Sequence, residues 1–139
     1  MAVVFVICPL FKETMQEKLA VNPGLREKFE DFKKTKEVNH MANFGSSDKM
    51  FNGEANFIKA VPKLRKAHLT HDLSIFYRLS GANPTVIELY GVFTHDEAGI
   101  GQPAHTGRQK QLGKKLVRQE FDALPQQQPP PPQQQQKRR

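Results

Sequence analysis

The sequence predicts an α+β domain, in which a helical pair packs on one face of a small, mostly antiparallel β-sheet and a C-terminal helix and a disordered tail follow. Three observations predict this class. A β-branched run opens the chain, two segments with helical spacing of apolar residues come next, and three strand-like segments follow them. A chain of 139 residues has room for one such core and not for a second.

The first half of the chain predicts one strand and two helices. Residues 3–8 are rich in β-branched side chains, which is typical of a strand buried on both faces, and Pro9 ends it. Residues 11–20 and 25–34 each place apolar side chains on one helical face. These positions are Phe11, Met15 and Leu19 in the first helix and Leu25, Phe29 and Phe32 in the second.

The second half predicts three successive strands and a last helix. Residues 39–57 lack periodicity and contain many Asn, Gly, Ser and Asp residues, which indicates a loop. The expected strands are residues 63–69, 73–79 and 86–94, and the expected helix is residues 108–121. In that helix Leu112, Leu116 and Val117 form the apolar side.

Composition predicts where the domain ends and what kind of partner it binds. Residues 126–139 contain only Gln, Pro and three terminal cations, so we expect a disordered tail behind a domain of residues 1–125. The formal net charge is +7, which favours a polyanionic partner such as a nucleic acid. A generic basic surface is the alternative, because three of these charges belong to the tail.

Cysteine and hydropathy indicate the compartment. Cys8 is the one cysteine, which excludes an intrachain disulfide and a cysteine-based zinc site and fits a reducing environment. The apolar run before Pro9 lacks the flanking features of a signal peptide, and no segment approaches the roughly 20 apolar residues that span a bilayer. We therefore expect a soluble, cytoplasmic protein with no membrane partner.

Strand pairing predicts a polar cluster at one end of the sheet. If residues 69–71 form a three-residue hairpin loop, His68 lies across from Asp72. Pairing Leu79 with Val86 in the next hairpin then sets His95 against Thr70. The side chains expected to converge are His68, His71, Asp72 and His95.

These residue types suit acid and base catalysis on a phosphodiester. Histidine has an ordinary pKa of roughly 6.5, so it can accept and donate protons near neutral pH. RNA supplies its own nucleophile, the 2′-hydroxyl, so the chemistry requires no metal and no cofactor. The cations expected to bind phosphate are Arg65, Lys66, His71 and Arg78.

Two alternatives stay open for this cluster. The same histidines and carboxylate are good ligands for zinc or another divalent ion, although no helical HExxH motif and no cysteine pair supports that. The pattern is also compatible with ordinary polar surface.

A second basic feature lies on the predicted last helix. Lys110, Lys114 and Arg118 recur at intervals of four and form one charged stripe. We expect the stripe to contact phosphates of ribosomal RNA. The alternative is a solvated helix face.

The segment LRKAHLTHDLSIFYR, at residues 64–78, together with Phe93-Thr94-His95, resembles the YafQ branch of the RelE/ParE toxin superfamily. The resemblance covers residues 60–98 closely and the order of the other elements loosely. The matching positions are Arg65, Ala67-His68, Asp72 three residues later, Tyr77 with a basic neighbour, and Thr94-His95.

The resemblance implies a fold, an activity and partners. Members of the superfamily pack a helical pair on a small antiparallel sheet and are mostly ribosome-dependent mRNA endoribonucleases, held inactive by a cognate antitoxin protein. It further implies His68, Asp72 and His95 as the catalytic set, with His95 as the general acid, and Arg65 as a phosphate ligand. His71 matches no catalytic position.

The sequence departs from the YafQ pattern at four places. Ala55 stands near the position of a further histidine, Leu73 replaces an aromatic residue, and Asp96 and Glu97 add negative charge after His95. A second function class is therefore a non-enzymatic binder, either a ParE-like inhibitor of a topoisomerase or a toxin that only occupies the ribosome. A binder has no need for titrating groups at one end of the sheet.

Overall fold

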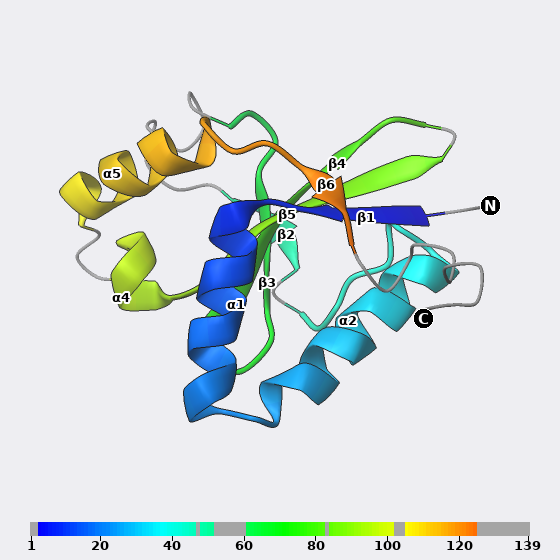
Figure 1. Cartoon of the computed structure of the whole chain (residues 1–139), viewed down its shortest axis with the longest axis horizontal. Helices are drawn as coiled ribbons and strands as arrows, with labels where there is room; N and C mark the ends of the chain where they lie inside the picture. Colours follow the sequence, from blue (N-terminus) through cyan, green and yellow to red (C-terminus); the bar gives the residue numbers. More distant parts are fainter. Residues whose placement is uncertain (1–2, 47, 52–60, 83, 102–104, 125–139) are drawn as a thin grey trace, which may run out of the picture.

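A six-stranded sheet forms the centre of the computed structural model, which describes residues 3–46, 48–51, 61–82, 84–101 and 105–124 (Figure 1). The strands are β1 (Val3–Ile7), β2 (Lys49–Met50), β3 (Arg65–His68), β4 (Leu73–Ser80), β5 (Thr85–Thr94) and β6 (Asp122–Ala123). Their spatial order is β2-β3-β4-β5-β1-β6, with β1 parallel to β5 and the other neighbours antiparallel. The predicted α+β class is confirmed.

Two long helices pack against the sheet, and two shorter ones lie at one end of it (Figure 1). The helices of the described residues are α1 (Pro9–Val21), α2 (Leu25–Val38), α4 (His95–Ala98) and α5 (Thr106–Leu116). Pro9 stands at the first position of α1, where the missing N–H is not needed. The same residue thus ends the first strand and begins the helix, which starts two residues earlier than predicted.

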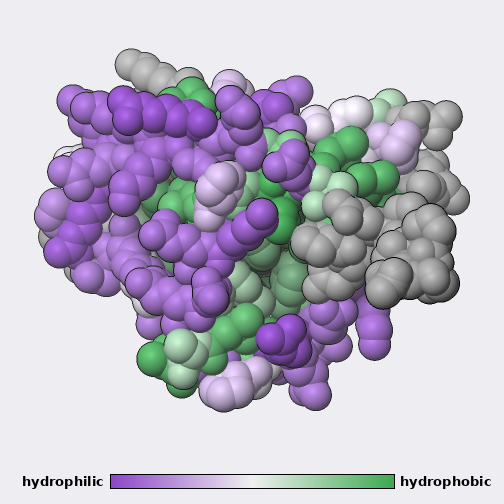
Figure 2. All heavy atoms as spheres, viewed as in Figure 1, coloured by the Kyte–Doolittle hydropathy of each residue, from purple (hydrophilic) through white to green (hydrophobic). Residues whose placement is uncertain are grey.

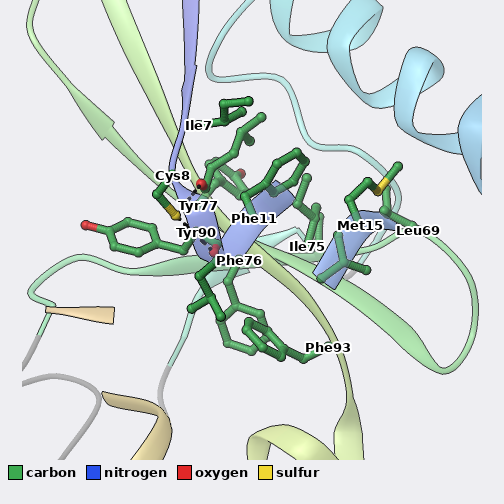
Figure 3. Packing of buried hydrophobic residues seen from close by; sticks show 14 of the residues in the cluster. Ile7, Cys8, Phe11, Met15, Leu69, Ile75, Phe76, Tyr77, Tyr90 and Phe93 are labelled. Carbon is green, nitrogen blue, oxygen red and sulfur yellow. Dashed lines mark hydrogen bonds between the residues drawn. The ribbon is translucent and has the colours of Figure 1, made fainter. Parts of the chain in front are cut away.

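The core has an aromatic layer on each face of the sheet. On the helical side, Phe32 of α2 meets Tyr77 of β4 edge-on, with ring centroids 5.3 Å apart. On the other side, Phe76 meets Phe93 at 5.6 Å. Figure 3 shows this cluster, with the Cys8 thiol donating to the backbone carbonyl oxygens of Leu89 and Tyr90.

The register between β4 and β5 differs from the predicted one by two single-residue shifts, one of which is a β-bulge. Leu79 pairs with Ile87 rather than Val86, and the register shifts once more between Phe76 and Tyr77. An extra residue in one strand moves every later pair by one position. Two single shifts together move the pairing by two residues, so each side chain stays on its predicted face of the sheet. The predicted residues therefore still meet at the same end of the sheet, although their cross-strand partners differ.

Several element boundaries were also wrong. The last helix ends at Leu116 rather than at 121, and Val117 is 59% exposed instead of joining the apolar side. β1 alternates between buried and half-buried residues rather than being buried on both faces. β2, α4 and β6 were not predicted from the sequence. The predicted disordered tail, residues 126–139, and Ala55 lie outside the described residues.

Among the residues that the structure describes, no helix combines the length and apolar composition that crossing a bilayer requires. Hydrophilic side chains cover α4 and α5, on the left of Figure 2.

Candidate functional site

His68 and His95 meet at one end of the sheet. His68 ends β3, and His95 is the first residue of α4, directly after β5. β4 pairs with both strands and brings the two ends together. The two Nε2 atoms are 3.1 Å apart, within hydrogen-bond distance, so one ring donates its N–H to the lone pair of the other. Two imidazole rings are therefore in direct contact at this end of the sheet.

The surroundings of this pair are cationic. Burial lowers the pKa of His68 below its ordinary value, and Lys66, His95 and His71 lower it further. Burial also lowers the pKa of Lys66, and the neighbouring Lys49 adds to this effect. His68 thus favours its neutral form, which is the form that accepts a proton.

Lys49 and Lys66 strengthen the positive charge on this side of the sheet. They are direct cross-strand partners in β2 and β3, and Lys66 shares a face with His68 because the two are two residues apart in one strand. Like charges placed opposite each other destabilise a sheet. A bound anion would relieve that repulsion, which makes this ladder suited to a phosphate.

The hairpin loop between β3 and β4 carries His71 and Asp72, both exposed. Backbone bonds shape the loop, with the Leu69 N–H donating to the Leu73 carbonyl at 2.8 Å. The predicted facing of His68 and Asp72 is wrong, because Ser74 is the cross-strand partner of His68. Asp72 lies in this loop, at the same end of the sheet as His68 and His95. Within the described residues its carboxylate has no hydrogen-bond or ion-pair partner, so it is available to a ligand.

The structure does not bring Arg65 or Arg78 to the histidines. The Arg65 Nε donates to the Tyr77 hydroxyl at 3.2 Å, on the helical face of the sheet. The Arg78 Nε donates to Glu88 at 3.0 Å. Arg78 lies four residues along β4 from Ser74, which is about 13 Å at the usual rise of a strand. Both arginines already have partners elsewhere.

A buried charge cluster on the helical face was missed by the sequence analysis. The Lys36 ammonium of α2 donates to Asp48 at 2.5 Å and to the Ala42 carbonyl at 2.7 Å. The Tyr77 hydroxyl donates to the other oxygen of Asp48. The side chains of Lys36 and Asp48 are 1% and 0% exposed, so the pair is desolvated. A lysine at a buried helical position and an aspartate in a loop produce no periodic pattern. The sequence therefore did not predict this cluster.

Ser74 also lies at the site, although the sequence did not predict it there. It is fully buried, faces His68 across β3 and β4, and faces Phe93 across β4 and β5. Its hydroxyl is the one buried side-chain polar atom of the described residues that lacks a hydrogen-bond partner. Such a group costs about 1–3 kcal/mol. A serine within a strand of apolar residues was the available signal.

The basic stripe is present only in part. Lys110 and Lys114 are exposed on α5, whereas Arg118 is exposed in the turn after the helix ends. The spacing that predicted the stripe therefore holds for the first two cations.

Among the described residues, no group of three or more His, Cys, Asp or Glu side chains is arranged to hold a metal ion. The four residues considered as alternative metal ligands, His68, His71, Asp72 and His95, thus do not form such a group.

Comparison with known proteins finds similarity at the level of the fold. No protein-family model matches the sequence, and no curated protein matches it. The solved structure of a YoeB/ParE toxin from Agrobacterium tumefaciens is similar with a TM-score of 0.52 and 16% sequence identity, over 68% of this chain and 99% of that chain. The likeness does not single out the YafQ branch. The chain has the fold of the RelE/ParE-like toxins.

Proposed function

We propose that this protein is a ribosome-dependent mRNA endoribonuclease, a toxin that acts in the cytoplasm and is held inactive by a cognate antitoxin protein. The observation that carries the proposal is the 3.1 Å contact between the Nε2 atoms of His68 and His95. These residues are 27 positions apart in sequence, and a surface of ordinary polarity has no reason to hold two imidazoles in contact at a cationic end. The similar fold of a YoeB/ParE toxin supports the class.

The proposed reaction is transfer of the phosphate to the neighbouring 2′-oxygen. His68, in its neutral form, accepts the proton of the 2′-hydroxyl, and the 2′-oxygen bonds to phosphorus. The bond from phosphorus to the 5′-oxygen breaks, and His95 donates a proton to that oxygen. The products are a 2′,3′-cyclic phosphate and a 5′-hydroxyl, so atoms and charge balance without a co-reactant. The phosphate enters between the rings and replaces their mutual hydrogen bond.

The neighbouring groups have supporting roles in this proposal. Asp72 stabilises an imidazolium formed during the reaction, and Lys66, Lys49 and His71 bind the phosphate. Arg65 and Arg78 are phosphate ligands only if they leave Tyr77 and Glu88, so we place them behind the lysines. Lys110, Lys114 and Arg118 remain candidates for contacts to ribosomal RNA.

A 2′-deoxy substitution tests the mechanism. We expect the protein to cut mRNA on translating ribosomes, and a single 2′-deoxy nucleotide at the cut site should block cutting, because it removes the nucleophile. The products should end in a 2′,3′-cyclic phosphate or its 3′-phosphate hydrolysis product. A matched message with a 2′-deoxy nucleotide several positions away is the control and should be cut normally.

Two outcomes contradict the proposal. Efficient cutting of the deoxy substrate would indicate a water activated by a metal rather than the 2′-hydroxyl. No cutting of either message would favour the non-enzymatic binder of the ribosome or of a topoisomerase.

A further inference from the structure

The short helix that carries His95 depends on other parts of the chain for its position. α4 has four residues, and an isolated helix of this length is not stable in water. A local capping box closes its beginning, with the Glu97 N–H donating to the Thr94 hydroxyl at 3.0 Å and the Thr94 N–H donating to the Glu97 carboxylate at 2.9 Å. The capping box shapes the turn but does not attach it to the sheet.

Lys18 of α1 attaches this turn to the body of the domain. Its ammonium lies 2.9 Å from one oxygen of Glu97 and 3.0 Å from the other, and it also donates to Glu17 at 2.8 Å. Lys18 is 6% exposed. Burial by itself lowers the pKa of Lys18, but the hydrogen bonds to Glu17 and Glu97 outweigh it and raise the pKa. The ammonium therefore stays charged and paired.

A second ion pair, from α5, holds α4 more weakly. Arg108 of α5 donates to the backbone oxygen of Asp96 at 3.2 Å and to its carboxylate. The side chains of Arg108 and Asp96 are 44% and 83% exposed. Pairs as exposed as this one contribute little to stability. Lys18 is consequently the stronger of the two attachments.

The space behind α4 makes these ion pairs more important. A cleft of about 450 Å³ separates α1, α4 and α5, and Glu17, Glu97 and Arg108 are among the residues that line it. Ala98 is the one buried apolar side chain of α4. With a cleft on that side, apolar packing alone gives the turn little support.

We propose that Lys18 is a positioning residue for His95, because its ion pair with Glu97 holds α4 so that the His95 ring stays in contact with His68. The assignment rests on the proposed function for its catalytic meaning. It also gives the acidic residues after His95 a role, since Asp96 and Glu97 are turned toward Arg108 and Lys18. Their negative charge is thereby neutralised at a distance from the phosphate.

The test compares two buried lysines. Lys18→Met removes the ammonium and keeps the length of the side chain, and Lys18→Arg should restore the ion pair. Lys33→Met is the matched control, because Lys33 is 7% exposed and pairs with Glu30 on its own helix α2. Each variant is examined as the full chain by thermal melting, by the pH titration of the imidazole Cε1–H resonances, and by RNA cutting.

We expect Lys18→Met to move the pKa of His68 toward its ordinary value, because a displaced His95 ring no longer lowers it. In RNA cutting kcat should fall about 10- to 100-fold with KM nearly unchanged, since a displacement of about 1 Å can cost 100-fold. Lys18→Arg should recover most of both properties. Lys33→Met should change neither. A merely structural lysine would lower the melting temperature and leave the titrations of folded protein as they are.

Wild-type ring titrations in folded Lys18→Met protein would overturn the assignment. If Lys18→Met does not fold, Glu97→Gln decides instead, because it weakens the same ion pair from α4 and keeps an oxygen for the Thr94 N–H. It should then shift the titrations in the same direction, and unchanged titrations would also overturn the assignment. The resonances are measured without RNA, so they test the positioning role of Lys18 independently of activity. If the wild-type protein cuts no RNA, the proposed function is wrong, but the titrations still show whether Lys18 positions His95.

Discussion

The two faces of the sheet differ in whether their charged side chains are paired. On the helical face, Lys36, Asp48 and Tyr77 are fully buried, and each has a partner of complementary charge or hydrogen-bonding type. At the end of the other face, Lys49, Lys66 and His68 lie together, and no carboxylate of the described residues pairs with them. A buried cluster in which every charged or polar group has a partner stabilises one specific fold. A cluster left unbalanced leaves an interaction for a ligand to complete, which is why we place the function at the histidines.

The first prediction concerns the unbalanced cluster and has the largest expected effect. His95→Ala and Asp72→Asn should each lower the rate of RNA cutting by about 10²- to 10⁴-fold, because each removes a group proposed to move or stabilise a proton. Asp72 lies in the loop before β4 and His95 begins α4 directly after β5, both outside the core, so the circular dichroism spectrum should not change. Primer extension on mRNA from translating ribosomes measures the cutting. Wild-type cutting by both variants would defeat the catalytic assignment.

The closed cluster should respond in stability rather than in activity. Asp48→Asn leaves the Lys36 ammonium buried without a counter-charge, and breaking a buried pair in this way typically costs about 3–5 kcal/mol. Denaturant unfolding measures the loss. Glu30→Gln is the control, because Glu30 is 44% exposed in its ion pair with Lys33. This substitution should cost at most about 1 kcal/mol. Equal losses in the two variants would show that the buried pair of Lys36 and Asp48 stabilises the fold no more than the exposed pair of Lys33 and Glu30.

Ser74 sharpens the comparison, since it is a buried polar group without a partner at the functional end. Ser74→Ala should leave stability unchanged or raise it by about 1 kcal/mol, because an unsatisfied hydroxyl is removed. Ser80→Ala is the matched control in the same strand and should lose stability, because the Ser80 hydroxyl donates to Glu88 at 3.3 Å. A loss of more than about 1 kcal/mol in Ser74→Ala would reveal a partner for its hydroxyl.

Much of the fold could be predicted from the sequence because its signals are local. The spacing of Phe11 and Met15, or of Phe29 and Phe32, predicts a buried helical face without any tertiary information. β2 and β6 are two residues long, too short for a periodic pattern, and only the strands beside them define them. The bulge lies opposite Phe76 and Tyr77, where Tyr90 is the extra residue of β5, and the neighbouring Gly91 was a local signal that could have indicated it.

The candidate site was predictable in its residues and not in its contacts. Counting along the strands brought His68 and His95 to one end of the sheet, because two single shifts in register preserve the face. A separate displacement in the hairpin between β3 and β4, where Leu69 still bonds to Leu73, replaced Asp72 by Ser74 opposite His68. The partners of Arg65 and Lys18 arise from packing between distant segments, which no local pattern encodes. The resemblance to the YafQ branch stays a prediction.

The smallest expected effect is the dependence of stability on pH, and it tests whether His68 belongs to the cationic cluster. Because the folded-state pKa of His68 lies below its ordinary value, the unfolded chain binds more protons in the interval between the two values. Stability should therefore fall as the pH drops from about 6.5 toward the lower folded-state pKa, and it should be fully retained above that interval. His68 is half-buried, so solvent screens the effect and the expected change is a modest slope.

His68→Asn should flatten this slope between pH 7 and 5.5, a range that lies above the titration of most carboxylates. Denaturant midpoints measured across this range, for wild type and variant, provide the comparison. His40→Asn, on the segment after α2, removes a histidine away from the cluster and should leave the slope in place. Lys66→Met should reduce the slope as well, because Lys66 follows burial among the causes of the lowered pKa. If His68→Asn and His40→Asn behave alike, His68 does not experience the cations around it, and the contrast between the two faces fails at its functional end.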